Sequence, residues 1–168
     1  MDCHSSVFHQ TYSARAPNSS PNDSWRGLRS SLTVANGNLV NVAGGSQLNL
    51  AGSLLALGNG STVNILNGLL LNVTGGSSVS IGGSLVSFSG AGNLLNVTNR
   101  LAPTAMLGGV PVFGPTDSLR ISGAALAGLG SAGAIRINGV ALTPTTPLSS
   151  LTGSLLAVQG GGTLKVGN

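Results

Sequence analysis

The residues able to do acid–base or metal chemistry gather at the N-terminus of this 168-residue chain. Cys3, His4 and His9 are its only thiol and both of its imidazoles, and Asp2 and Asp23 are two of its three carboxylates. Three such nitrogen and sulfur ligands are enough for part of a zinc or copper site. We interpret the group as an accidental cluster in a polar leader, and therefore predict no metal site and no cofactor.

Beyond residue 29 the chain has almost no side chain that exchanges a proton near neutral pH. It contains no His, Cys, Glu, Tyr or Trp there, and Asp117 and Lys165 are its single acid and single lysine. General acid–base catalysis needs groups of these kinds. A glycosidase needs a pair of carboxylates, and a nucleophilic serine needs a base beside it. We therefore expect that the protein is not an enzyme and has no catalytic residues.

The charge pattern argues against nucleic acid and membrane partners. The formal net charge is +4 and the pI is about 10.8, but the seven basic residues are scattered singly along the chain. No aromatic residues alternate with them to stack on bases, so we expect no nucleic-acid partner. The apolar stretch 121–135 lies between Arg120 and Arg136 and is shorter than the roughly 20 residues of a spanning helix. No membrane-spanning segment is predicted.

Residues 30–97 carry a repeat built from two strand motifs. The first has the form Ser-x-apolar-polar-apolar and occurs as SSLTV, SQLNL, STVNI and SSVSI at 30–34, 46–50, 61–65 and 77–81. The second carries an extra Leu and occurs as NLVNV, SLLAL, LLLNV, SLVSF and NLLNV at 38–42, 53–57, 69–73, 84–88 and 93–97. The first motif recurs after 15 or 16 residues, and so does the second as far as its copy at 84–88. Gly-Gly or Asn-Gly pairs, which allow sharp reversals, stand between the strands.

Alternating polarity within these motifs predicts strands with one buried face. A pair of such short strands cannot bury its apolar face alone, so successive repeats must stack. We therefore expect an all-β chain forming a parallel β-solenoid with about two short strands per 15–16-residue repeat, in which Leu48, Val63 and Val79 lie one above another. The same glycine signals also suit a meandering antiparallel sheet. The predicted core residues are Leu32, Val34, Leu48, Leu50, Val63, Ile65, Val79 and Ile81.

Four segments follow from these patterns. Residues 1–29 are expected to be a disordered polar leader without the apolar stretch of a signal peptide. Residues 30–97 are the regular repeats, and residues 98–153 are an irregular segment rich in Pro and Gly, with strands expected at 117–121 and 133–137. Residues 154–168 resume the repeat and are expected to end without a cap, as in a fragment or an end-to-end assembler.

Two columns of side chains are candidate surfaces. One consists of the extra leucines of the second motif, which either fill the core or form an exposed ladder for association with a partner: Leu39, Leu54, Leu70, Leu85 and Leu94. The other is an outward polar column of Asn41, Asn72 and Asn96, interrupted by Ala56 and Ser87. Asparagine ladders stabilise a stack through side-chain hydrogen bonds, and contact with a glycan is the functional alternative.

The motifs SLLAL, SLVSF and SLLAV, alternating with SQLNL, STVNI and SSVSI, resemble the passenger repeats of filamentous-haemagglutinin-like and autotransporter-type bacterial surface proteins. The resemblance covers about residues 30–97 and 153–168. It implies a parallel β-helix displayed outside the cell, in adhesion, biofilm or a surface layer, and hence an extracellular or cell-surface location.

We therefore expect an extracellular structural or adhesive β-solenoid whose partners are other copies of itself or cell-surface polymers. One alternative is a self-assembling, functional-amyloid-like fibre, because strands with little charge can template further strands. Another is a glycan- or ice-binding solenoid. That function needs a regular Thr face, whereas Thr33, Thr62, Thr74 and Thr98 do not share one register.

Overall fold

The computed structural model describes residues 30–115, 118–121 and 125–167, and it shows an all-β chain. In these residues the strands form four sheets, and the one 3-10 helical turn is η1 (Leu148–Ser150). The leader predicted at residues 1–29 lies outside the described residues.

Two of the sheets have five strands each. Sheet A contains, in spatial order, β1 (Ser31–Val34), β5 (Thr62–Ile65), β9 (Asn93–Val97), β14 (Gly133–Ile137) and β15 (Val140–Ala141). Sheet B contains, in spatial order, β10 (Ala105–Leu107), β11 (Val110–Phe113), β16 (Leu156–Val158), β6 (Leu71–Val73) and β2 (Val40–Val42).

The other two sheets are smaller. Sheet C contains, in spatial order, β12 (Leu119–Ile121), β17 (Thr163–Val166), β7 (Ser78–Ile81) and β3 (Gln47–Leu50). Sheet D contains, in spatial order, β13 (Leu126–Ala127), β8 (Val86–Ser89) and β4 (Leu55–Gly58).

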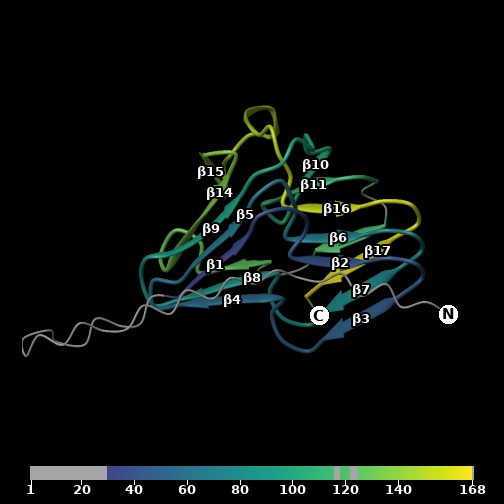
Figure 1. The fold of residues 1–168 in the computed structure, drawn as a ribbon, viewed down its shortest axis with the longest axis horizontal. Coiled ribbons are helices and arrows are strands. Elements are labelled where there is room, and N and C mark those ends of the chain that lie inside the picture. The colour runs from purple at the N-terminus through teal and green to yellow at the C-terminus, as the bar shows by residue number, and fades with distance from the viewer. Residues whose placement is uncertain (1–29, 116–117, 122–124, 168) are drawn as a thin grey trace, which may run out of the picture.

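The chain visits sheets A, B, C and D in that order, and we call each such passage a coil. Coil 1 consists of β1 to β4, and coil 2 of β5 to β8. Between these coils every strand pairs in parallel with its counterpart 31 positions later, as Ser31 does with Thr62 and Val40 with Leu71. Figure 1 shows the resulting stacks of strands arranged around a common interior.

The corners between strands stack as regularly as the strands do. Gly75, at the corner between sheets B and C, has a φ of 63°, a conformation that glycine adopts without strain. Its carbonyl oxygen accepts a hydrogen bond from the Gly45 N–H of coil 1 at 2.8 Å. On the other side, the N–H of Gly76 donates to the Gly160 carbonyl at 2.9 Å. Coil-to-coil hydrogen bonds therefore satisfy the backbone at this corner as well as in the strands.

Aliphatic side chains that point inward from the four sheets form the core. In sheet A, Val34, Ile65, Val97 and Ile137 occupy one column, because each is the register partner of the next. The last three are fully buried, whereas Val34 is half-buried because β1 is the edge strand of the sheet. The core is therefore a set of stacked aliphatic columns that no single coil could enclose.

The all-β class and the parallel pairing of the repeats are confirmed, and the antiparallel meander is wrong for residues 30–97. The predicted stacking of adjacent repeats is also wrong. Leu48 pairs with Val79 in sheet C, but Val63 pairs with Leu32 in sheet A. Two strands of three or four residues are too short to surround an apolar interior, so one coil uses two sequence repeats and four strands.

Residues 98–153, predicted to be irregular, contain two antiparallel hairpins among their described residues. Strands β10 and β11 form the first, and β14 and β15 form the second. The strands expected at 117–121 and 133–137 correspond to β12 and β14. Because β10 and β15 are the last strands of sheets B and A, each hairpin ends a parallel stack with an antiparallel strand.

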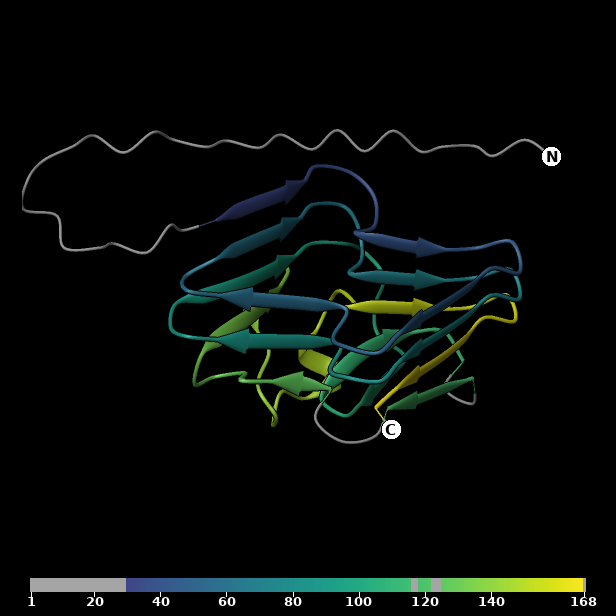
Figure 2. The same ribbon diagram turned by 90° about the horizontal axis from the view of Figure 1, so that it is seen from below.

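The C-terminal strands β16 and β17 lie between strands that precede them in the sequence. β16 separates β6 from β11, so that Leu156 is the register partner of both Leu71 and Val112. β17 separates β7 from β12 in the same way, with Leu164 between Val79 and Leu119. In Figure 2 the yellow strand β17 lies between the teal strand β7 of coil 2 and the green strand β12.

This insertion corrects the expectation of an uncapped C-terminal repeat at 154–168. Both β16 and β17 have a strand neighbour on each side. The unpaired strand edges of coil 1 are instead those of β1, β2, β3 and β4, each of which is the last strand of its sheet within the described residues. The sequence motif alone cannot show this, because an inserted strand and a terminal strand carry the same alternation.

The side chain of Asn99 links the backbone of Gly68, Leu101 and Ser154 just before strand β16 begins. Its Nδ2 donates to the backbone oxygens of Gly68 (3.0 Å) and Ser154 (2.7 Å). Its Oδ1 accepts from the N–H groups of Leu101 and Ser154, both at 3.1 Å. The backbone of Asn99 also exchanges two hydrogen bonds with the side chain of Asn138, at 2.7 and 3.0 Å. One carboxamide thus fixes the path of the chain into β16.

Candidate functional site

The outer face of sheet C carries a column of polar side chains that crosses the inserted strand β17. Along each strand, inward aliphatic residues alternate with outward polar ones, as period-two geometry requires. One outward column runs through Asn49, Ser80, Lys165 and Arg120, each the register partner of the next. The column is neutral in coils 1 and 2 and becomes cationic at the inserted strand and its neighbour.

A groove of about 280 Å³ lies across these strands. It is lined by three residues from each of three neighbouring segments, namely 78–80, 118–120 and 163–165. Ser78, Ser118 and Thr163 contribute hydroxyl groups, while Lys165 and Arg120 contribute a primary ammonium and a guanidinium. The volume lies just below the range of about 300–1,000 Å³ that is usual for small-molecule sites.

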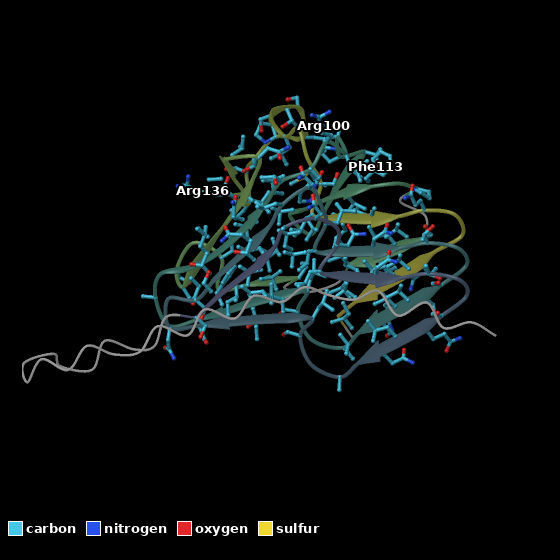
Figure 3. All side chains as sticks on the ribbon, viewed as in Figure 1. Arg100, Phe113 and Arg136 are labelled. Carbon is cyan, nitrogen blue, oxygen red and sulfur yellow. The ribbon has the colours of Figure 1, made fainter. Side chains whose placement is uncertain are left out.

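Lys165 and Arg120 are direct neighbours on adjacent parallel strands. Adjacent strands are about 4.8 Å apart, so two exposed cations share one small area of surface. The described residues contain no Asp or Glu, and therefore no carboxylate among them faces this pair. Figure 3 places the other two described arginines elsewhere: Arg136 is beside β14 and Arg100 is near the top of the view, whereas β7 and β17 lie at the lower right in the same orientation.

The chemistry of the groove is that of binding. Ammonium and guanidinium groups donate hydrogen bonds and do not accept them, and hydroxyl groups do both. These side chains can neutralise and orient an anion. They do not supply the carboxylate or imidazole base that proton transfer in hydrolysis requires.

The predicted core residues occupy two sheets, with sheet A holding the residues of the motifs at 30–34 and 61–65 and sheet C holding the others. In coil 2, Val63, Ile65, Val79 and Ile81 are buried. Their coil 1 counterparts pack against the core but are only half-buried, because a single neighbouring strand covers them. These coil 1 residues are Leu32, Val34, Leu48 and Leu50.

The extra leucines do not form one column. Leu70 and Leu85 are fully buried, on the way into sheets B and D respectively, so an exposed apolar ladder is wrong for them. Their coil 1 counterparts pack against the core and are half-buried. Leu94 differs, because it pairs with Thr62 and Ala134 in sheet A. The five residues of this predicted ladder are Leu39, Leu54, Leu70, Leu85 and Leu94.

The predicted asparagine column is likewise divided between sheets. Asn72 donates from Nδ2 to Asn41 Oδ1 at 2.7 Å in sheet B, while Asn96 donates to Asn64 at 3.4 Å in sheet A. Ala56 and Ser87, which were expected to interrupt the column, pair with each other in sheet D. Positions 41, 56, 72 and 87 recur every 15 or 16 residues and therefore alternate between sheets B and D, because a coil takes 31 positions.

Sequence reasoning missed the cationic pair, although a signal was present. The strand motifs that contain Arg120 and Lys165 both place a basic residue between two apolar ones, Leu-Arg-Ile and Leu-Lys-Val. Arg136 has the same setting, Ile-Arg-Ile, but belongs to sheet A. Only the insertion of β17 beside β12 decides which two of these three residues become neighbours.

Among the described residues there is no group of three or more His, Cys, Asp or Glu. The cluster of Cys3, His4 and His9 lies outside those residues. No helix in the described part of the chain is long and apolar enough to cross a membrane. Comparisons of the chain with protein-family models, with curated proteins and with solved structures find no match.

Proposed function

We propose that this chain is a parallel β-solenoid from the outside of a bacterial cell, with a structural or adhesive role. The observation that carries the proposal is the constant register of 31 positions between the strands of coils 1 and 2. Such stacking gives a stiff body whose outer faces repeat the same side chains from coil to coil. A body of this kind acts through extended surfaces, which suits a spacer or an adhesin.

The residue types support a binding role without catalysis. Beyond residue 29 there is one carboxylate, Asp117, and there is no imidazole or thiol. The groove on sheet C offers cations and hydroxyls, which bind ligands but lack a base to activate water or serine. The extracellular location rests on the motif resemblance and on the single cysteine, Cys3, which is compatible with export.

A binding and degradation assay tests this function. Purified full-length chain is passed over immobilised neutral and acidic polysaccharides, and the length of each polymer is then measured by size-exclusion chromatography. We expect retention on at least one polymer with its length unchanged. Shortening of any polymer would show an enzyme, and passage through all of them without delay would remove the adhesive role.

A fibre-forming protein is a second candidate, and the observation that favours it is that β1 to β4 each have an unpaired edge among the residues that the structure describes. Edge strands with half-buried aliphatic side chains are sites at which further strands add. Sedimentation velocity over a range of concentrations tests the fibre, because a chain that stays monomeric at every concentration excludes fibre formation. If fibres form, Asn41→Lys on edge strand β2 should block growth, whereas Asn64→Lys on the central strand β5 should not.

A further inference from the structure

The geometry points to an oxyanion-binding site in the sheet C groove, in which Lys165 and Arg120 hold one carboxylate, sulfate or phosphate group of a larger ligand. The inference deepens the proposed adhesive function by naming the ligand class, and it rests on that function only for the biological setting. The binding itself is a property of the groove.

The first argument is that the pair is not explained by the stability of the fold. Like charges placed directly opposite each other on neighbouring strands destabilise a sheet. The same column carries Asn49 in coil 1 and Ser80 in coil 2, which shows that neutral polar residues fill this position in the stack. Two cations at the next two levels therefore need a counter-charge, and none of the described residues is acidic.

The second argument is the shape of the groove and its hydrogen-bond donors. Lys165 presents three N–H donors and Arg120 presents a planar fork that matches an oxyanion in bidentate fashion. The hydroxyls of Ser78, Ser118 and Thr163 line the same groove. A space of about 280 Å³ is larger than one oxyanion requires, so the organic part that carries the anionic group can lie against the hydroxyls.

The third argument is that the site is assembled by the topology. Lys165 and Arg120 are 45 positions apart in sequence, and they become neighbours only because β17 lies between β7 and β12. Hydrogen-bonded strands hold both residues at fixed Cα positions, so the two side chains start from neighbouring points of a rigid sheet before a ligand arrives. Preorganisation of this kind reduces the cost of binding.

The test compares Lys165→Gln, Arg120→Gln and the double variant with Arg136→Gln, which removes another exposed cation, from β14 in sheet A. Binding to immobilised dextran sulfate and polygalacturonate is measured by biolayer interferometry, with neutral dextran as the blank. We expect the double variant to lose at least about tenfold in affinity and Arg136→Gln to lose less than about twofold. Raising NaCl from about 20 mM to about 300 mM should weaken wild-type binding, because salt screens exposed charges.

Two further arms identify the source of the anionic group. Inorganic sulfate and phosphate are titrated while the backbone amides of Lys165 and Arg120 are followed by NMR. Specific binding of either ion shifts these two amides and leaves that of Arg136 in place. Tighter binding of one polymer than of the free ions shows that the carrier contributes, whereas equal affinity shows that the group alone is recognised. Both results support the site.

Other outcomes overturn the inference. Equal losses in the sheet C variants and in Arg136→Gln would mean attraction by net charge alone. Asp117, three positions before Arg120 in the sequence, lies outside the described residues. If Asp117→Asn binds anions and the wild-type chain does not, the Asp117 carboxylate already neutralises Lys165 and Arg120, and the proposed site is not available to a ligand. Retention by neutral polysaccharides without any anion binding would remove this site and leave the adhesive function standing, whereas polymer cleavage would remove the function and leave the site.

Discussion

Coils 1 and 2 and the C-terminal part of the chain bury the same kinds of side chain but build their sheets differently. In the first region, register partners are 31 positions apart, as Leu48 and Val79 are. In the second, Leu164 has one partner 85 positions away, Val79, and another 45 positions away, Leu119. The first region is stacked in the order of the sequence, whereas the second is closed by a strand pair that enters between earlier strands.

The difference separates two ways in which a strand can contribute to a stack of coils. A coil within a regular stack contacts only its neighbours, so its loss shortens the stack. The inserted strands β16 and β17 each lie between two earlier strands, so the loss of both leaves one gap in sheet B and one in sheet C. The groove on sheet C belongs to the second kind of construction, because β17 supplies its central strand.

The largest expected loss of stability comes from deleting the inserted strands. Removal of residues 154–168 would leave β6 and β11, and also β7 and β12, about two strand spacings or roughly 9.6 Å apart. We expect this variant to lose its cooperative urea transition, measured by far-UV circular dichroism. It would also remove the buried side chains Leu155, Leu156, Val158, Leu164 and Val166.

The matched control is the deletion of residues 36–66, which removes one complete period of 31 positions and joins Ala35 to Asn67. This chain keeps every inserted contact and should fold with reduced stability. A cooperative transition that survives removal of residues 154–168 but not removal of residues 36–66 would reverse the comparison between the two regions.

The next effect concerns close backbone approach beside the inserted strand. Gly114 has a φ of 120°, and a Cβ placed there would lie 1.8 Å from the carbonyl oxygen of Val158. We expect Gly114→Ala to lower the free energy of unfolding by about 3 kcal/mol or more, because it combines backbone strain with a clash. Gly109→Ala is the control. Gly109 also has a positive φ, 77°, but a Cβ added there meets no atom of the described residues within 4 Å. The substitution should therefore lower the free energy of unfolding by about 1 kcal/mol. Equal losses of unfolding free energy in the two variants, measured by urea denaturation, would show that backbone strain alone accounts for the cost at Gly114.

A smaller loss of stability is expected at Asn99, whose side chain links three backbone segments just before β16. Asn99→Ala leaves the backbone groups of Gly68, Leu101 and Ser154 without the four hydrogen bonds described above, and we expect a loss of about 2–3 kcal/mol. Asn96→Ala, which removes only a 3.4 Å hydrogen bond on the outer face of sheet A, should cost about 0.5 kcal/mol or less. Hydrogen exchange of β16 amides should rise in the first variant alone. Similar exchange in both would mean that Asn99 does not hold β16 in place.

The sequence allowed the individual strands to be predicted better than their partners. Alternation located Val63, Ile65, Val79 and Ile81 in strands with buried faces because side-chain direction is a local property of the backbone. It could not decide whether Val63 lies above Leu48 or above Leu32, because repeats of 15 and 16 residues look alike. The groove was beyond local reasoning for the same reason, since Lys165 meets Arg120 only through the inserted strand.

The smallest effect tests how far the polar ladder of the regular coils extends into the inserted strand. Asn72 Oδ1 is buried and has no hydrogen-bond partner among the described residues, and the residue stacked on Asn72 from β16 is the fully buried Ala157. Ala157→Ser would place a hydroxyl donor at the end of the Asn41–Asn72 ladder. We expect a gain of about 0.5–1 kcal/mol in the free energy of unfolding, the usual net value of a neutral hydrogen bond. In an Asn72→Ala background the same change should give no gain. A gain there as well would trace the effect to β16 itself, and would mean that the ladder of coils 1 and 2 ends where the inserted strand begins.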